Sequence, residues 1–408
     1  MARHARRLIY WIIGAAFALA LLAVLAVLAL VWFVDPNAWR ARIARSASDA
    51  LGRQVQLGGD LHWNIGWNIA IASEGGSIAN APGFDATPFA QWQRLRFGLD
   101  ARALLGKRIV IDQLAIDGLQ VNLQRDAAGA GNWIFAPAKA EPNANGSAAG
   151  AKPITLQVAS LQLRDSQLTF RDAKGVVAPG TAALWQLHDL SLDVKLPADL
   201  KAPVRELRDV ALRGRLAGGP LPAAGIAVAF EAAYLKQDAS AATLAVPALQ
   251  ARWDDVQLSG SVNAMYGAPL TANGQLTLRV PSVRMQLERL KVALPPMADP
   301  KTLGRLDVDG SFDLKGSALA VTGLHVVLDD TQLSGTVSMP QFRPLALRFE
   351  LAGDAVDFDR YLEPADYKGK PFELPLAQLK ALNVQGVLRM KSATVMGAKA
   401  TELRIDVE

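Results

Sequence analysis

Side chains that could do chemistry are few in this sequence and lie far apart. The chain contains no cysteine, so thiol catalysis and zinc–thiolate sites are excluded. No Gly-x-Ser-x-Gly nucleophile turn and no phosphate-binding loop occurs. The histidines are widely separated, and none has a second ligand at the spacing of a metal site: His4, His62, His188 and His325. We therefore expect no catalytic residue, no cofactor and no metal, and a protein that is not an enzyme.

Two pairs of adjacent acids, Asp254–Asp255 and Asp329–Asp330, come closest to a catalytic carboxylate pair. Both occupy the same place in an internal repeat. The series Leu-Ala-Val, Leu, Asp-Asp, Gln-Leu-Ser-Gly and Val at 244–262 recurs 75 residues later at 319–337. Acids at turns and sheet edges cap the backbone and keep it soluble. We interpret both pairs as turn residues of a repeated structural unit.

The elements that carry these residues are predicted to be strands. Beyond residue 52, apolar and polar residues alternate, most clearly at 119–124, 161–164, 168–170, 276–280 and 345–351. Frequent Gly and Asp-Gly positions predict tight turns, so the sheet should be largely antiparallel. One helix is expected over Val283–Leu294, with Ser282 as N-cap and Pro295–Pro296 at its end. Such repeats can stack as a closed solenoid, a sandwich or an open sheet curled around a groove.

The amino-terminal segment predicts a membrane anchor. The run from Leu8 to Val34 has no charged side chain and would form a helix about 40 Å long, enough to span a bilayer. Its bulky end distinguishes it from the shorter apolar segment of a signal peptide, and the alternative is a long signal peptide cut near Ala20. Arginines lie on both sides of the span, so charge alone does not orient it. We expect the amino terminus in the cytoplasm and the bulk of the chain on the other side.

A short helix should follow the span. Asp35 can cap it, Pro36 suits its first turn, and Gly52 supplies a stop. Apolar residues recur every fourth position from Trp39 to Leu51. The helix could lie on the outer leaflet with its arginines near lipid phosphates, or pack on the first strands with a solvated basic face. The candidate membrane-surface contacts are Trp32, Trp39, Arg40, Arg42 and Arg45.

Composition and linkers divide the chain into four parts. Residues 1–34 form the cytoplasmic stub and anchor, 35–135 a first region beyond the membrane, and 154–408 the repeated strand region. Residues 136–153 between them contain no aromatic or large aliphatic side chain, which predicts a flexible linker. The net charge of +5 is small for 408 residues, and the basic residues are scattered beyond the span, so we expect no nucleic-acid partner.

Several short motifs resemble the AsmA family of bacterial envelope proteins. They follow the basic stub and single span and are found at 35–37, 51–53, 80–84, 104–105, 126–133, 328–335 and 358–362. The resemblance implies an inner-membrane anchor and a periplasmic, elongated β-sheet groove, similar to TamB and to chorein-type bridge proteins thought to conduct lipids. It also implies a link to outer-membrane biogenesis. Family members usually continue beyond the alternating segment 403–408, so we expect a truncated sequence.

A lipid role is physically consistent with this pattern. A curved sheet with an apolar inner face would shelter acyl chains from water while the head groups stay solvated, and no chemical step is needed. The partners would be the phospholipid bilayer and its acyl chains, together with possible envelope proteins. The alternative is a non-catalytic scaffold or assembly factor for outer-membrane proteins with a closed sheet. The candidate groove-lining residues are Leu276, Leu278, Val280, Leu333, Val337, Leu345, Leu347 and Phe349.

Overall fold

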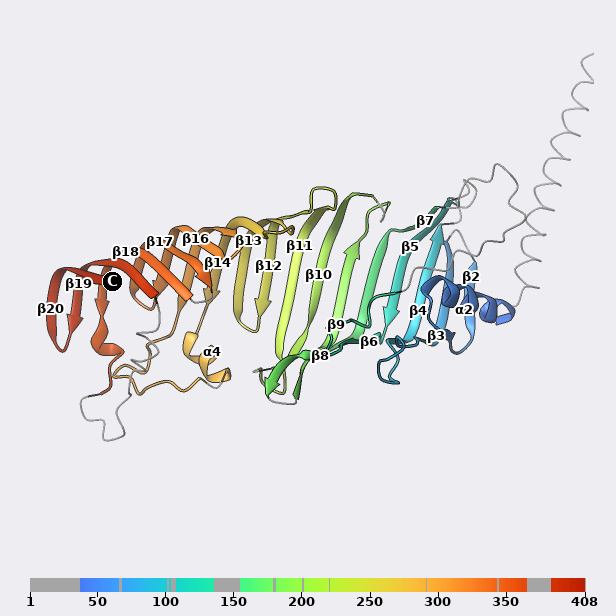
Figure 1. The fold of residues 1–408 in the computed structure, drawn as a ribbon, viewed down its shortest axis with the longest axis horizontal. Helices are drawn as coiled ribbons and strands as arrows, with labels where there is room; N and C mark the ends of the chain where they lie inside the picture. The colour runs from blue at the N-terminus through green and yellow to red at the C-terminus, as the bar shows by residue number, and fades with distance from the viewer. Residues whose placement is uncertain are drawn as a thin grey trace, which may run out of the picture. The chain divides into compact units, whose positions relative to one another are not determined.

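The protein is mainly β, with a few short helices (Figure 1). A computed structural model describes residues 37–65, 68–100, 103, 108–135, 155–178, 181–199, 202–219, 221–290, 292–342, 345–364 and 383–407. These residues form two compact units. Unit 1 takes the described residues within Met1–Asp117 and Asn132–Leu156, and unit 2 those within Gly118–Gly131 and Gln157–Glu408. The expected linker at 136–153 lies outside the described residues, and residues 118–131 group with unit 2.

Unit 1 is a small antiparallel sheet that follows a helix. Its elements are α2 (Asn37–Leu51), β1 (Val55–Leu57), β2 (Leu61–Ile65), β3 (Asn68–Ile78), β4 (Ala90–Asp100) and β5 (Arg108–Asp117). β1 and β2 pair with successive parts of one edge of β3, while β4 pairs with the other edge and β5 pairs with β4. The short β7 (Thr155–Val158) includes residues assigned to both units.

The helix predicted after the span is confirmed as α2. Gly52 follows its last residue with φ +64°, a conformation that glycine adopts without strain. The Asn37 side chain accepts a hydrogen bond from Leu61 N–H, and the Ser48 hydroxyl accepts one from Val55 N–H. These bonds tie both ends of α2 to the first strands, although Ile43 in its middle keeps 49% exposure.

Unit 2 is a sheet in which each strand follows its predecessor side by side. The strands are β6 (Gln120–Arg125), β8 (Ser160–Ala178), β9 (Thr181–Lys195), β10 (Val204–Gly218), β11 (Ile226–Asp238), β12 (Thr243–Trp253), β13 (Val256–Met265), β14 (Thr271–Val280), β15 (Leu306–Lys315), β16 (Ala318–Leu328), β17 (Thr331–Phe342), β18 (Leu345–Asp357), β19 (Asn383–Val395) and β20 (Ala398–Val407). The pairs β6–β8 and β18–β19 are parallel, and the others from β8 to β20 are antiparallel. The expectation of a largely antiparallel sheet is confirmed.

Among the described residues of unit 2, two short helices interrupt the sheet, α4 (Val283–Arg289) after β14 and the 3-10 helix η1 (Phe358–Arg360) after β18. Ser282 caps α4 as predicted, with its hydroxyl accepting from Met285 N–H at 3.3 Å. The predicted end at Leu294 is wrong, because α4 stops at Arg289 and Leu290 has left the helical conformation. Pro295 disfavours a helical conformation for Leu294, and the chain turns instead through a bond from Val292 N–H to Leu287 O.

The sequence repeat is confirmed as a structural repeat of three strands and a helix. The first repeat contains β12, β13, β14 and α4, which begin at 243, 256, 271 and 283. The second contains β16, β17, β18 and η1. Each begins 75 residues after its counterpart, except β18, which begins 74 residues after β14. The equivalent Gly260 and Gly335 have φ of +146° and +151°. A Cβ at either would lie 1.9 or 2.0 Å from a backbone oxygen of the next strand, so neither position can carry a side chain. The Asp-Asp pairs form the turns β12–β13 and β16–β17, as predicted.

Candidate functional site: an apolar groove in unit 2

One row of residues crosses unit 2 without a polar or charged member. Successive register partners define it from β8 to β20, and we call the face that carries it the apolar face. The row is Leu163, Leu192, Leu212, Phe230, Ala251, Leu258, Leu278, Val308, Val326, Leu333, Gly353, Met390 and Leu403. Directly paired residues point to the same side of a sheet, so the row is a continuous apolar track.

A second track runs beside the first across the carboxyl-terminal strands. It joins Gly274, Phe312, Val321, Val337, Phe349, Gly386 and Val407 by the same register rule. Its glycines are covered by neighbouring rings, since a Cβ on Gly274 would lie 2.9 Å from Phe312 and one on Gly386 would lie 2.6 Å from Phe349. The rings of Phe312 and Phe349 therefore occupy the space beside these glycines.

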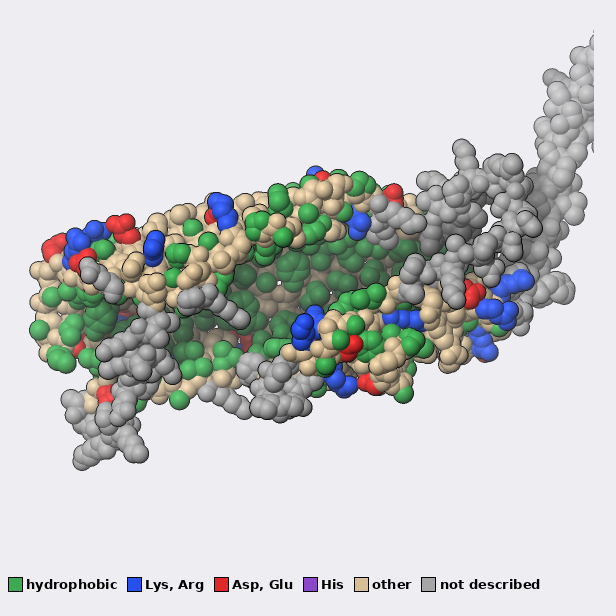
Figure 2. Space-filling view, viewed as in Figure 1, with side chains coloured by type: hydrophobic (Ala, Val, Ile, Leu, Met, Phe, Trp, Pro, Cys, Tyr) green, Lys and Arg blue, Asp and Glu red, His purple; other side chains and the backbone are tan. Residues whose placement is uncertain are grey.

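The apolar face lines a hollow and is only partly buried. Figure 2 shows hydrophobic side chains gathered in the hollow of unit 2 between two rims of strand ends. Along the first track Leu163 and Met390 are buried, while Leu212, Phe230, Leu278, Val308 and Leu333 are half-buried. A sheet normally packs an apolar face against a second layer. The helices that the structure describes in unit 2, α4 and η1, lie at the ends of strands and do not provide such a layer.

The opposite face of the sheet is polar. Arg213 pairs with Glu231 at 2.9 Å, and Arg389 pairs with Glu350 at 3.1 Å. A cavity of about 690 Å³ opens among such residues, including Glu231, Gln250 and Gln275. Its lining mixes polar and apolar side chains, whereas the tracks of the apolar face have no polar member, so the apolar face is the stronger candidate for a site that binds hydrocarbon.

β-Bulges keep the apolar side chains on one face of the long strands. Asp165, Asp189 and Asp209 have φ of +48°, +50° and +50°, and each stands at a shift of register in β8, β9 or β10. Aspartate tolerates this left-handed conformation better than most residues. A bulge adds one residue and bends its strand, so the apolar alternation resumes on the same side and the sheet curls.

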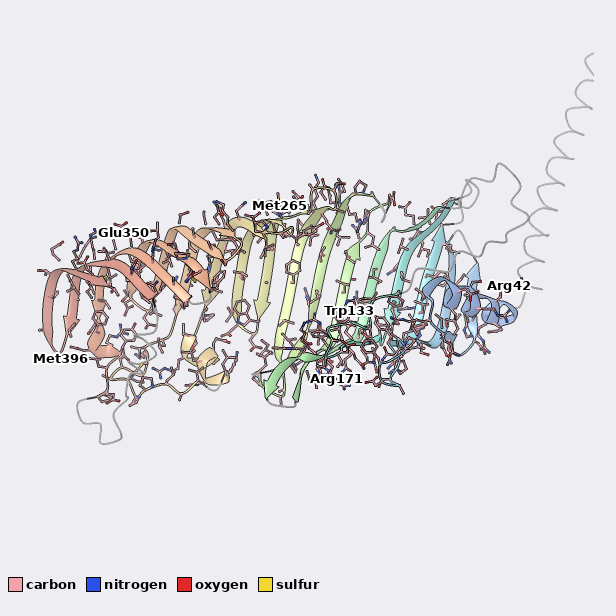
Figure 3. The ribbon with its side chains drawn as sticks, in the orientation of Figure 1. Arg42, Trp133, Arg171, Met265, Glu350 and Met396 are labelled. Carbon is pink, nitrogen blue, oxygen red and sulfur yellow. The ribbon has the colours of Figure 1, made fainter. Side chains whose placement is uncertain are left out.

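The two rims of the hollow are formed by different turns and short helices. The upper rim of Figure 1 includes the turns after β13 and β17, where Met265, Tyr266, Leu270, Phe342 and Leu345 are each 39–48% exposed. The lower rim includes the Asp-Asp turns, α4, η1 and the β19–β20 turn. Figure 3 shows Met265 and Met396 at these opposite rims. Exposed apolar side chains thus border the hollow on both sides, with Leu290 and Met396 at the lower rim, and the charged turns belong to the lower rim.

The charged turns hold the short helices. Arg289 of α4 donates to Asp254 at 2.9 Å and to Asp255 at 3.4 Å. In the second repeat, Arg360 donates to Asp330 at 2.8 Å and to Asp299 at 2.9 Å. The backbone N–H of Lys301, and then Arg360, lower the pKa of Asp299 below its usual value. These acids act as anchors for rim segments in both repeats.

The predicted groove-lining residues fall on the apolar face. Leu278 and Leu333 belong to the first track, and Val337 and Phe349 belong to the second. Leu276, Val280 and Leu347 share the face by alternation along β14 and β18, while Leu345 stands at the rim with 39% exposure. The predicted lining residues include none from β8 to β13, although apolar residues of these strands continue the track.

The predicted membrane-surface residues are only partly placed. Trp32 lies outside the described residues, and the structure describes the backbone of Trp39 in α2. Arg40 donates to Gly59 O at 2.6 Å, while Arg42 and Arg45 are exposed on the same helix. Within the described parts of the chain, no helix has the length and apolar character to cross a membrane, and the predicted span at Leu8–Val34 lies outside them.

A buried arginine brings the amino-terminal motifs together in unit 1. Arg53 is 8% exposed and donates to the carbonyl oxygens of Asn132 at 2.5 Å and Ile134 at 3.0 Å. Its guanidinium lies 4.0 Å from the ring centre of Phe135 and 5.1 Å from that of Phe89. Burial lowers the pKa of Arg53. The rings stabilise the cation in place of a carboxylate.

A second bond extends this cluster. Asn132 is fully buried, and its amide donates to the side-chain oxygen of Asn80 at 2.9 Å. The motifs around 51–53, 80–84 and 132–133 thus meet in one place, and the cluster fixes the end of α2 against two loops. Leu104–Leu105 lies outside the described residues. The two phenylalanines that flank Arg53 were missed because they stand outside those motifs.

The fold and its site define a class: β-sheet proteins with an extended apolar groove and repeated strand units. No group of three or more possible metal-binding side chains occurs within the described residues. A model of the AsmA family matches residues 5–216, just over half of the sequence. The chain belongs to the AsmA family, which is generally associated with the bacterial envelope. No curated protein and no solved structure matches the chain.

Proposed function

We propose that this chain is a non-enzymatic, inner-membrane-anchored periplasmic protein of outer-membrane biogenesis that holds or conducts phospholipid along the apolar face of unit 2. The continuous apolar track carries the proposal. Most of its members are half-buried, so they keep solvent-exposed apolar surface that acyl chains would cover. The polar outer face and the open side of the hollow would leave head groups in water. No cofactor is required.

The anchor and the location belong to the same proposal. Family membership and the uncharged run at 8–34 support an envelope protein with its amino terminus in the cytoplasm. The chain has no native cysteine, so one introduced thiol is a probe without background. Met396, 86% exposed, offers a site for it. An impermeant maleimide should label Met396→Cys when only the outer membrane is permeabilised, and labelling confined to lysed cells would overturn this location.

The competing proposal is a non-catalytic scaffold or assembly factor for outer-membrane proteins. In that case another protein would cover the apolar face or bind the polar face. Neighbouring residues of β18 separate the two ideas, because Leu347 lies on the apolar face and Arg348 points to the opposite side.

The experiment places a photo-crosslinking amino acid at Leu347 or at Arg348 in the full chain in cells. A lipid groove gives phospholipid adducts at position 347 and few at position 348. The Arg348 variant is the matched control, since it shares the strand and differs in the face it presents. Protein adducts at both positions with no phospholipid at 347 would favour the scaffold and contradict the lipid proposal.

A further inference from the structure

A cavity of about 380 Å³ lies where η1 meets the apolar face, and we call it the η1 cavity. Leu333, Leu388 and Met390 line its sheet side, and Phe358 and Tyr361 line its η1 side. The remaining lining residues are Leu328, Thr331 and Val356. Small-molecule sites usually measure about 300–1,000 Å³, so this one is small.

The walls of the η1 cavity are held from three directions. The Tyr361 hydroxyl donates to Asp329 at 2.6 Å, and Arg360 donates to Asp330 and Asp299. On the other side, Asp359 accepts from Met396 N–H at 2.5 Å and from Gly397 N–H at 2.7 Å. These bonds fix η1 to the β16–β17 and β19–β20 turns. The cavity is therefore formed before any ligand enters.

A comparison of the two sequence repeats shows residues that contribute to the volume of the η1 cavity. In the first repeat the register partners at the equivalent place are Trp253 and Val256, and Val256 is only 1% exposed. In the second repeat they are Leu328 and Thr331, and Thr331 is half-buried. The hairpin of the first repeat thus carries a larger pair near α4, and that of the second repeat carries a smaller pair near η1. The smaller pair contributes to the volume, together with Leu388 and Met390 of β19.

We propose that the η1 cavity binds the terminal part of one acyl chain of a phospholipid. The proposal rests on the proposed function, because the rest of the lipid would lie on the apolar face. Leu333 and Met390 belong both to the cavity and to the first track, so a chain can pass from one to the other over continuous apolar surface. The Tyr361 hydroxyl points to Asp329, which leaves the cavity with a hydrocarbon lining. The site would retain a lipid at a defined position in the groove.

The test uses the full chain in vesicles of phosphatidylethanolamine and phosphatidylglycerol. A small fraction of the phosphatidylglycerol bears a diazirine either at the end of an acyl chain or beside the glycerol. After irradiation, adducts are mapped by mass spectrometry. The terminal probe should label the β17 and β19 segments that line the cavity, and the glycerol-proximal probe should label the apolar face elsewhere.

The decisive variant is Leu328→Trp with Thr331→Val, which installs the pair that the first repeat already accommodates. Labelling in the cavity should fall about tenfold, the change expected when roughly two buried methylenes are excluded. Labelling elsewhere on the apolar face should persist. Thr336→Trp, exposed on the opposite face of β17, is the control for an added indole. Thr331→Leu repeats the test with a smaller change if the double variant does not fold.

The outcomes separate the two proposals. Undiminished cavity labelling in the folded variant overturns the acyl site. Adducts on the apolar face of the native chain but never in the cavity overturn the site and leave the proposed function standing. Absence of adducts anywhere overturns both. Cavity labelling by a diazirine fatty acid, without labelling by the phospholipid, overturns the phospholipid as occupant.

Discussion

The substitution Leu278→Asp tests whether the apolar track is an open groove. Leu278 stands in the middle of the first track, between Leu258 and Val308, and it is half-buried. A carboxylate there interrupts the track without changing the strand's turns or ion pairs. In an open groove water can reach the charge, whereas in a closed core it would be stripped of water.

The two cases differ in magnitude. Complete burial of a leucine side chain stabilises a protein by about 1.5–3 kcal/mol, so losing a half-buried one costs about 1 kcal/mol. A carboxylate that keeps part of its hydration adds a further cost, for a total of about 2 kcal/mol. In a closed core the unpaired charge would cost much more and the protein would unfold or keep the acid protonated. We expect Leu278→Asp to fold with a modestly lowered melting temperature.

The assay combines circular dichroism on heating with native mass spectrometry of the detergent-extracted protein. Leu278→Asp should remain folded and retain less phospholipid than the native chain. Gln275→Asp is the matched control, because Gln275 is exposed on the opposite face of the same strand. It should retain as much lipid as the native protein. Unfolding of Leu278→Asp at room temperature, or equal lipid retention by both variants, would refute the open groove.

Three further predictions concern the clusters that hold the fold. Arg53→Ala should lower the free energy of unfolding by about 3 kcal/mol, since it removes two charge-assisted bonds and the ring contacts, and exposed Arg45→Ala should not. Because the pKa of Asp299 is lowered in the fold, its contribution is present above about pH 4 and disappears as pH falls through the lowered value. The difference in melting temperature between native chain and Asp299→Asn should therefore vanish in acid. Burial, and then Asp329, raise the pKa of Tyr361 above its usual 10, so its stabilising effect is lost only as pH rises beyond that value. Spectrophotometric titration should show a late-ionising tyrosine that Tyr361→Phe removes.

Much of unit 2 could be predicted because strand alternation and turn chemistry are local. The β12–β13 and β16–β17 hairpins follow from alternation on both sides of an Asp-Asp turn, and their 75-residue spacing is visible in the sequence. The parallel pairs β6–β8 and β18–β19 were not predicted. Their partners are separated by long segments, so no turn residue specifies them.

The sequence did not reveal that the apolar track continues through β8. Apolar residues occupy 161 and 163 and then 168 and 170, so the alternation changes phase and reads as two segments. Asp165 absorbs the change as a bulge, and Leu163 and Leu168 face the same side of one continuous strand. Whether an Asp ends a strand or forms a bulge depends on the neighbouring strand, which the sequence does not display. For the same reason the ring partners of Arg53 could not be chosen beforehand.

The two sequence repeats share the bonds that anchor a short helix and differ in the size of one pair of apolar-face residues. Both repeats anchor a short helix through an arginine bound to an Asp-Asp turn, so the backbone plan is set by residues that lie outside the apolar face. Within that plan, Trp253–Val256 and Leu328–Thr331 occupy equivalent pairs and differ in size. The size of this pair is therefore one determinant of the cavity, and β19, which runs parallel to β18 and supplies Leu388 and Met390, is another. Contacts with hydrocarbon depend on area and shape rather than on directional bonds. The size of such a pair therefore determines how much of an acyl chain that part of the groove can hold.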